Sequence, residues 1–228
     1  HDALESVCTK VGALGPLCAA LRVLEDSGKE SAGGGHNNAV AACTEALQPE
    51  GRLVVIMRGL PGSGKSAIGR RLAQAWRHTF ANGTSTLASA DTFFEAGAGL
   101  SRQRLQQLAG MPGAPNSVYR LCFDPSKVGA AHAHCRRQFQ DGLHSGCGLV
   151  LVDNTNTTIQ EYAYYRRAAR QAAYECVVVE VLGGRLQLGN LAELHARNTH
   201  GVPLQVMQKM YERWQPDDSS EAVARLRP

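Results

Sequence analysis

One glycine-rich stretch sharply limits the folds open to this chain. Residues 59–66 read GLPGSGKS, which fits the phosphate-binding pattern GxxxxGK[ST]. The stretch follows a continuous apolar run at residues 53–57 and precedes a segment in which Ile68, Leu72 and Trp76 share one helical face. A chance match is expected in only about one in two hundred chains of this composition. The pattern therefore predicts a P-loop between a buried strand and a helix.

Each position of the loop has a chemical reason. Glycines let the backbone turn its N–H groups toward phosphate oxygens, and the following helix directs its positive end to the same place. Lys65 is predicted to reach the β- and γ-phosphates, and Ser66 to bind Mg²⁺, partly through water. The expected cofactors are thus ATP or GTP with Mg²⁺. The candidate nucleotide site comprises Gly59, Leu60, Pro61, Gly62, Ser63, Gly64, Lys65, Ser66 and Ala67.

Strand and helix patterns alternate from residue 52 onward. Further strands are expected at residues 85–90, ending at Asp91, then at 149–152 and 175–182. Helices are expected at 127–143 and 157–173, and residues 96–118 read as an irregular insertion around a helix at 103–108. Two last helices, 189–198 and 203–214, would form a lid hinged at Gly201-Val202-Pro203. The predicted fold is α/β: a P-loop kinase with a doubly wound parallel sheet, a C-terminal helical lid and a helical N-terminal extension.

The chain divides into two parts at about residue 50. Residues 1–50 are expected to be a helical N-terminal extension of open role, and residues 51–228 a single P-loop domain. An apolar share of 43% suits a globular protein, and no run of eighteen apolar residues predicts a membrane span. The chain opens on His1 rather than Met and shows no signal peptide, which leaves open whether its native N-terminus is included.

Charge and cysteine content point to an intracellular protein. The net charge of +4 rests mainly on arginine, whose planar fork suits phosphate, although most single arginines serve as solvated helix faces. Seven cysteines are irregularly spaced and form no CxxC pair. This usage predicts reduced thiols in the cytoplasm or nucleus rather than a disulfide framework or a zinc site.

Three charged residues are candidates for chemistry beyond the loop. Asp91 ends the second predicted strand, where a carboxylate can take a proton from an acceptor hydroxyl, or alternatively cap a helix. Asp153 ends the third strand and could bind magnesium, orient the acceptor or an arginine, or simply make a turn. Arg197 precedes the predicted hinge and could meet charge on the transferred phosphate, or be an exposed helix arginine.

Four segments together resemble the polynucleotide-kinase family, which includes bacteriophage 5′-polynucleotide kinase and its animal relatives. They are RGLPGSGKS (58–66), SADTFF (89–94), LVDNTN (151–156) and ARNTHGVPLQVMQKMYERW (196–214), and they agree in order and spacing across residues 52–214. The resemblance implies that Lys65 and Ser66 hold phosphates and magnesium and that Asp91 is the general base. It also implies that Asp153 lies in the acceptor site and helps fix a lid arginine, Arg197, that clamps the donor phosphates.

The chain departs from the family pattern at two arginines. Phe94 stands where the phage enzyme has an arginine for acceptor phosphate, and Gly201 where it has a second lid arginine. Compensation could come from Arg102, Arg104, Arg120, Arg136 or Arg137. Phe93 and Phe94 could stack on a terminal base or pack in the core. The candidate acceptor-binding residues are Asp91, Phe94, Asp153, Asn154, Thr155 and Asn156.

These features lead to one main hypothesis and two alternatives. The main one is a 5′-hydroxyl polynucleotide kinase that phosphorylates RNA or DNA ends for repair or ligation, with nucleic acid as its partner and no membrane. The family's phosphoesterase and phosphatase partner domains are absent here, so further domains of a larger protein are expected. The alternatives are a small-molecule or nucleoside kinase of the same fold, and a nucleotide-gated binding module with weak chemistry.

Overall fold

A parallel sheet of five strands forms the centre of the molecule in a computed structural model that describes residues 52–80, 83–181, 191–218 and 221–223. The strand order is β2-β3-β1-β4-β5. The predictions for residues 1–50 lie outside the described residues, as do the ends of a predicted strand at residue 182 and of a helix at 189–190. The strands are β1 (Leu53–Arg58), β2 (Ser85–Ala88), β3 (Leu149–Asp153), β4 (Glu175–Val181) and β5 (Glu221–Val223).

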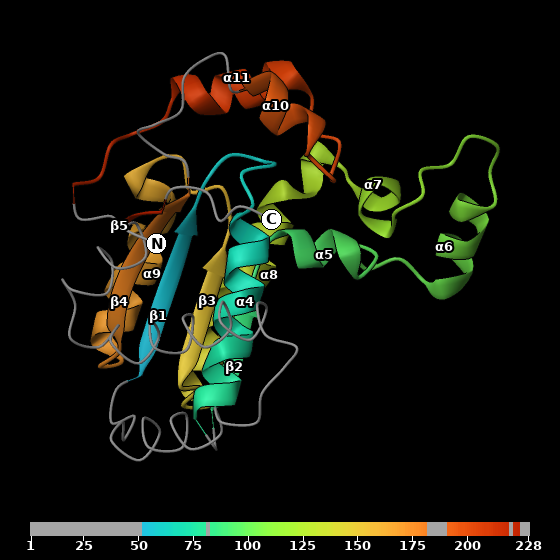
Figure 1. The fold of residues 1–228 in the computed structure, drawn as a ribbon. Coiled ribbons are helices and arrows are strands. Elements are labelled where there is room, and N and C mark those ends of the chain that lie inside the picture. The colour runs from blue at the N-terminus through green and yellow to red at the C-terminus, as the bar shows by residue number, and fades with distance from the viewer. Residues whose placement is uncertain (1–51, 81–82, 182–190, 219–220, 224–228) are drawn as a thin grey trace, which may run out of the picture.

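Helices cover both faces of this sheet, as Figure 1 shows. The doubly wound α/β prediction is therefore confirmed. The helices are α4 (Lys65–Thr79), α5 (Asp91–Glu95), α6 (Arg102–Ala109), α7 (Val118–Cys122), α8 (Val128–His144), α9 (Ile159–Gln171), α10 (Leu191–Ala196) and α11 (Leu204–Glu212), with a 3-10 turn η1 at Pro125–Lys127.

The two central strands bring the two most important strand ends together. Every residue of β1 and β3 is buried, as their continuous apolar runs predict. They pair in parallel with Met57 opposite Asp153, so the P-loop and the segment after β3 leave the same edge of the sheet side by side. One face packs against Ile68, Leu72 and Trp76 of α4. The other packs against Phe139 of α8 and against Tyr162 and Tyr165 of α9.

An arm made of α5, α6 and α7 projects from the body of the sheet (Figure 1). The insertion predicted at residues 96–118 around a helix is present, with α6 as that helix. The short helices α5 and α7, the turn η1 and strand β5 did not follow from the sequence pattern. A small apolar cluster joins the arm to α8: Phe94, Ala98, Tyr119 and Cys122 pack with Ala131 of α8.

The last two helices lie across the carboxyl end of the sheet (Figure 1). Helices α10 and α11 pack together through Leu191, Leu194 and Met207, and this cluster also encloses Leu60 of the P-loop. The segment between them contains Gly201, whose φ of 71° fits the predicted hinge. Within the described part of the chain, every helix is too short or too polar to cross a membrane.

Candidate functional site

The glycine-rich segment folds as an anion cradle. Gly62 and Gly64 have φ angles of 77° and 92°, a left-handed conformation that turns the backbone inward. Helix α4 begins at Lys65 with no acidic residue in its first turn and no side-chain cap. Within the described ranges, the N–H groups of Gly62, Gly64, Lys65 and Ser66 have no protein acceptor. Four free donors at a helix N-terminus suit a phosphate chain.

Lys65 is a buried cation without a counter-charge. Its residue is 8% exposed, and none of the acidic side chains that the structure describes forms an ion pair with it. Burying an ammonium group without an anionic partner is costly. A triphosphate in the cradle would supply that missing anion, so the conformation of Lys65 fits the predicted nucleotide.

Asp153 supplies a second unbalanced group next to the cradle. It is the last residue of β3 and is 5% exposed, yet its Oδ1 atom has no hydrogen-bond partner among the described residues. The Oγ atom of Ser63 in the P-loop is equally buried and unpartnered. Buried polar atoms are nearly always hydrogen-bonded, so these two orphans indicate a ligand. Oxygen donors are what Mg²⁺ binds, and Ser66 with Asp153 therefore fits the magnesium that a P-loop expects.

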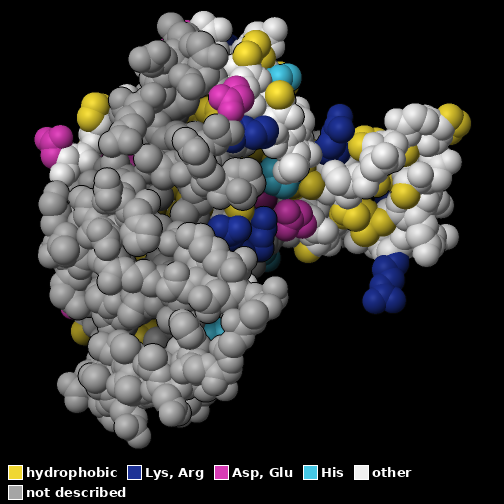
Figure 2. Space-filling model, in the orientation of Figure 1, with side chains coloured by type: hydrophobic (Ala, Val, Ile, Leu, Met, Phe, Trp, Pro, Cys, Tyr) yellow, Lys and Arg dark blue, Asp and Glu magenta, His cyan; other side chains and the backbone are white. Residues whose placement is uncertain are grey.

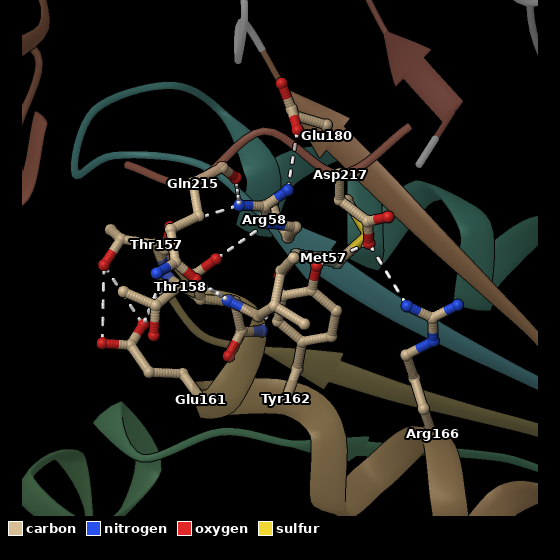
Figure 3. Close-up of polar contacts among 12 residues, drawn as sticks. Met57, Arg58, Thr157, Thr158, Glu161, Tyr162, Arg166, Glu180, Gln215 and Asp217 are labelled. Atoms are coloured by element: carbon tan, nitrogen blue, oxygen red, sulfur yellow. Dashed lines mark hydrogen bonds and ion pairs between the residues drawn. The ribbon is translucent and has the colours of Figure 1, made fainter. Parts of the chain in front are cut away.

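Arg58, the residue just before the loop, lies at the centre of a network of polar contacts (Figure 3). It is fully buried, its Nη1 lies 2.9 Å from Glu180 Oε2 on β4, and its Nε donates to the carbonyl of Asn156 at 2.8 Å. Its Nη2 donates to the carbonyls of Thr157, at 3.2 Å, and Gln215, at 2.7 Å. One side chain thus ties together β1, β4, the segment after β3 and the segment after α11.

Two aromatic rings complete the setting of this arginine. The guanidinium carbon lies 5.1 Å from the ring centroid of Tyr162 and 4.4 Å from that of Trp214, within the range of a cation–π interaction. The Tyr162 hydroxyl in turn donates to Asp217, which also pairs with Arg166 (Figure 3). Nothing in the strand pattern signalled this network, although a charged residue placed directly after an apolar run was a visible anomaly.

The segment after β3 uses its polar side chains for structure. Asn154 Oδ1 accepts from the N–H of Ala90 at 3.0 Å and thereby joins the ends of β2 and β3. Asn156, at φ 48°, donates from Nδ2 to the carbonyl of Met57 at 2.8 Å. The carbonyl of Thr155 accepts from the N–H of Gly59 at 3.0 Å. These contacts hold the strand ends and the P-loop in register, and the binding of the acceptor by these three residues stays a prediction.

Asp91 lies beyond the end of β2. That strand stops at Ala88, two residues before the predicted end at residue 90, and Asp91 is the first residue of α5. Its carboxylate does not cap the helix, because the N-cap is Ala90 and has no side-chain hydrogen bond. The side chain is 36% exposed, and its Oδ2 lies 3.7 Å from Nε2 of His200. Asp91 is thus a partly exposed carboxylate just beyond the strand next to β3, and its role as general base stays a prediction.

Two other predicted residues occupy less direct positions. Phe94 is 2% exposed and packs against Tyr119 and Phe123, so the idea that it stacks on an acceptor base is wrong for this conformation and the core alternative holds. Arg197 follows the end of α10 and pairs with Glu193 at 3.6 Å, an exposed contact that constrains it weakly. It lies one turn after Leu194, on the helix that covers the P-loop.

The lid helices touch the loop directly. A Cβ added to Gly62 would collide with the carbonyl oxygen of Leu194 on α10, so these two backbones are in close contact. Leu60 is fully buried in the α10–α11 cluster. Figure 2 shows basic, acidic and histidine side chains close together where this helix pair, the sheet and the α5–α7 arm meet. The candidate site is therefore bounded on three sides.

Comparison with known proteins identifies the family. Residues 54–216 match the family described as AAA domain, a span that contains the P-loop, Asp91, Asp153 and Arg197. The chain belongs to this family. As an AAA domain, it is a P-loop nucleotide-binding domain related to kinases and NTPases, and the geometry of the loop agrees with nucleotide binding, which in such loops typically includes Mg²⁺.

Individual relatives of this AAA domain are distant and much longer. Human NEDD4-binding protein 2 is 26% identical over 165 residues, which is 72% of this chain and 8% of that protein. Rat and human YLP motif-containing protein 1 are 24% and 23% identical over 178 residues, which is 75% of this chain and 12% and 8% of those proteins. The chain thus spans about a tenth of the length of these relatives.

Proposed function

We propose that this AAA domain transfers the γ-phosphate of ATP or GTP to the 5′-hydroxyl end of RNA or DNA. The observation that carries the proposal is the charge arrangement at the strand ends, taken over the described residues: a buried Lys65 that pairs with none of their carboxylates, a buried Asp153 whose Oδ1 has no hydrogen-bond partner among them, and a partly exposed Asp91 beyond the next strand. A nucleotide-only switch needs the first two groups. A second carboxylate with access to solvent is what an acceptor hydroxyl requires.

The residues would divide the reaction as follows. The free N–H groups of the loop and Lys65 hold the phosphates, while Ser66 and Asp153 would hold Mg²⁺. The bound metal supplies charge neutralisation on the phosphate oxygens. Asp91 takes the proton of the acceptor hydroxyl as its oxygen bonds to the γ-phosphorus, and the bond from that phosphorus to the β–γ bridging oxygen breaks to release nucleoside diphosphate. Arg197, released from Glu193, meets the charge that develops on the leaving group.

A nucleic-acid acceptor is supported by the surroundings of Asp91. The four segments shared with the polynucleotide-kinase family all lie around this site, in matching order. Arg120 on α7 is exposed, and its guanidinium lies against the backbone of Gly201, within reach of an extended anionic chain that approaches Asp91. Such an enzyme would act on nucleic-acid ends in the cytoplasm or nucleus, as one part of a larger repair protein.

A direct transfer assay tests this proposal. The protein is incubated with γ-labelled triphosphate, Mg²⁺ and 5′-OH oligonucleotides of RNA and of DNA, beside Lys65→Ala and Asp91→Asn. Asp141→Asn, an exposed aspartate on α8, serves as the matched control. We expect labelled oligonucleotide with the unchanged protein and the control, and at least a hundredfold less with the other two variants.

The same assay separates the competing functions. Nucleosides, sugars and vitamins are offered as acceptors in parallel reactions, and their labelling without any labelling of oligonucleotides would favour a small-molecule kinase. Triphosphate binding with no transfer to any acceptor would favour a binding module. Full transfer by Asp91→Asn would remove the assigned base.

A further inference from the structure

The segment that follows α10 holds the backbone of His200 in a small hydrogen-bonded loop. The N–H of His200 donates to Oδ1 of Asn198 at 3.1 Å, and Nδ2 of Asn198 donates to the carbonyl of Val202 at 3.0 Å. Gly201 between them adopts a left-handed φ of 71°. These bonds close a small local loop, so the backbone that carries His200 is held in place within its own segment.

This imidazole lies between two groups of the arm. Its Nε2 is 3.7 Å from Oδ2 of Asp91, a distance within ion-pair range but longer than a hydrogen bond. Its ring centroid is 4.0 Å from that of Tyr119 on α7, at an interplanar angle of 44°. His200 therefore connects the lid to both α5 and α7.

Tyr119 approaches the same carboxylate from the opposite element. Burial raises the pKa of its phenol, and the negative charge of Asp91 and a hydrogen bond to that side chain raise it further. Asp91 is thus contacted by Tyr119 from the arm and by His200 from the lid. A carboxylate has about four lone-pair sites, so both contacts leave room for an acceptor hydroxyl.

Few charged groups of the described residues lie near His200. Asp91 faces it from α5, with Glu95 one turn further along that helix, and Tyr119 faces it from α7. The guanidinium of Arg120 lies beside Gly201, where an added Cβ would be 3.1 Å from Nε. Asp91 is therefore the acidic side chain that the structure places within ion-pair distance of His200.

We propose that His200 is a positioning residue through which the lid orients the general base. His200 and Leu194 both belong to the lid. The contact of His200 with Asp91 and the contact of Leu194 with Gly62 are therefore made together, when α10 and α11 cover the P-loop. The base is then oriented for proton transfer only while the nucleotide is covered. This inference rests on the proposed function, because it deepens the role of Asp91 in that reaction.

Substitution of His200 separates positioning from packing. His200→Ala removes both the polar contact and the ring, whereas His200→Gln restores an N–H donor without the ring. The matched control is His195→Ala, an exposed histidine on α10 of the same lid. We expect His200→Ala to lower kcat ten- to a hundredfold with the KM for triphosphate within about twofold of the unchanged protein. His200→Gln should recover most of kcat, and His195→Ala should behave as the unchanged protein.

Hydrogen exchange supplies a readout that does not need turnover. With a non-hydrolysable triphosphate and Mg²⁺, residues 91–95 and 198–202 should gain protection together in the unchanged protein and in His195→Ala. In His200→Ala the protection of residues 91–95 should be lost while that of the P-loop remains. Absence of transfer by every form would end the proposed function, yet this exchange result would still test the contact.

Two results would overturn the inference. One is a kcat for His200→Ala within twofold of the unchanged protein, or equal losses in His200→Ala and His200→Gln, because then the polar contact does nothing. The other is unaltered protection of residues 91–95 in His200→Ala. Melting temperatures of all variants are measured alongside, so that unfolding is not mistaken for loss of positioning.

Discussion

Replacing Arg58 by methionine should be among the most damaging single changes in the described part of the chain. The guanidinium makes an ion pair with Glu180 and donates to the carbonyls of Asn156, Thr157 and Gln215. Methionine has a similar length and fills part of the space between the two flanking rings. The change therefore removes the charge and the donors while keeping much of the apolar volume.

The magnitude follows from burial. Glu180 would keep a charge in a site that is 6% exposed, without its arginine, and breaking a buried ion pair in this way costs about 3–5 kcal/mol. Domains are stable by only about 5–15 kcal/mol, so this is a large share of the total. For a domain of this size, the loss corresponds to a fall in melting temperature of roughly 6–20 °C.

Urea titration followed by circular dichroism measures this loss. Arg213→Met is the matched control, because Arg213 pairs with Glu161 at 3.2 Å while both side chains stay partly exposed, and such pairs contribute about 0–1 kcal/mol. Arg58→Met combined with Glu180→Met also removes the buried carboxylate that lost its arginine, and should recover part of the lost stability. If Arg58→Met costs no more than Arg213→Met, the reasoning about burial is refuted.

Three further changes test the loop, the buried lysine and a thiol. Gly62→Ala should weaken triphosphate binding at least tenfold by calorimetry, because the added Cβ would collide with the backbone of Leu194 and because φ at this position is left-handed. The control Gly129→Ala lies on α8 with open space around the added Cβ. It should leave binding unchanged and raise the free energy of unfolding by about 0.5–1 kcal/mol. Lys65→Met should raise or preserve the melting temperature without ligand, since it removes a buried charge, and should abolish the increase that triphosphate produces; a lower melting temperature would contradict this. Burial raises the pKa of the Cys176 thiol from 9.0 to about 11. Between these pH values the folded state keeps a proton that the unfolded state has lost. The contribution of this thiol to the free energy of unfolding should therefore be constant below pH 9 and fall by roughly 2–3 kcal/mol up to pH 11. Cys176→Ala should remove that part of the alkaline loss, and an identical pH profile in both proteins would contradict the assignment.

The sequence predicted best what depends on short stretches of chain. The run at residues 53–57 is apolar throughout because β1 is covered on both faces, and the glycines of the P-loop are needed locally for its left-handed turns. Both signals lie within a few residues of the structure that they specify. The positions of β1, β3 and β4, and the placement of the loop between β1 and α4, could therefore be derived without knowledge of the rest of the chain.

Side-chain roles that depend on distant partners were not predictable in this way. The contacts of Arg58 come from residues 98 to 157 positions away in the sequence, so no local pattern announces them. The burial of Phe94 was not predictable, because it depends on Tyr119 of α7, a five-residue helix that has no clear sequence pattern. His200 gained meaning only when the fold brought it to Asp91.

Leu60 belongs to the P-loop by its backbone and to the lid by its side chain. Its backbone belongs to the loop that would grip the nucleotide, but its side chain is an integral part of the apolar interior of the α10–α11 pair. Lifting those helices must therefore expose a leucine to water, at a cost of about 2 kcal/mol. That cost alone would slow the release of nucleoside diphosphate about thirtyfold. Leu60→Ala should therefore release the nucleotide faster than the unchanged protein in a stopped-flow measurement. One side chain thus couples the loop that would bind the nucleotide to the helices that must move before the nucleotide leaves.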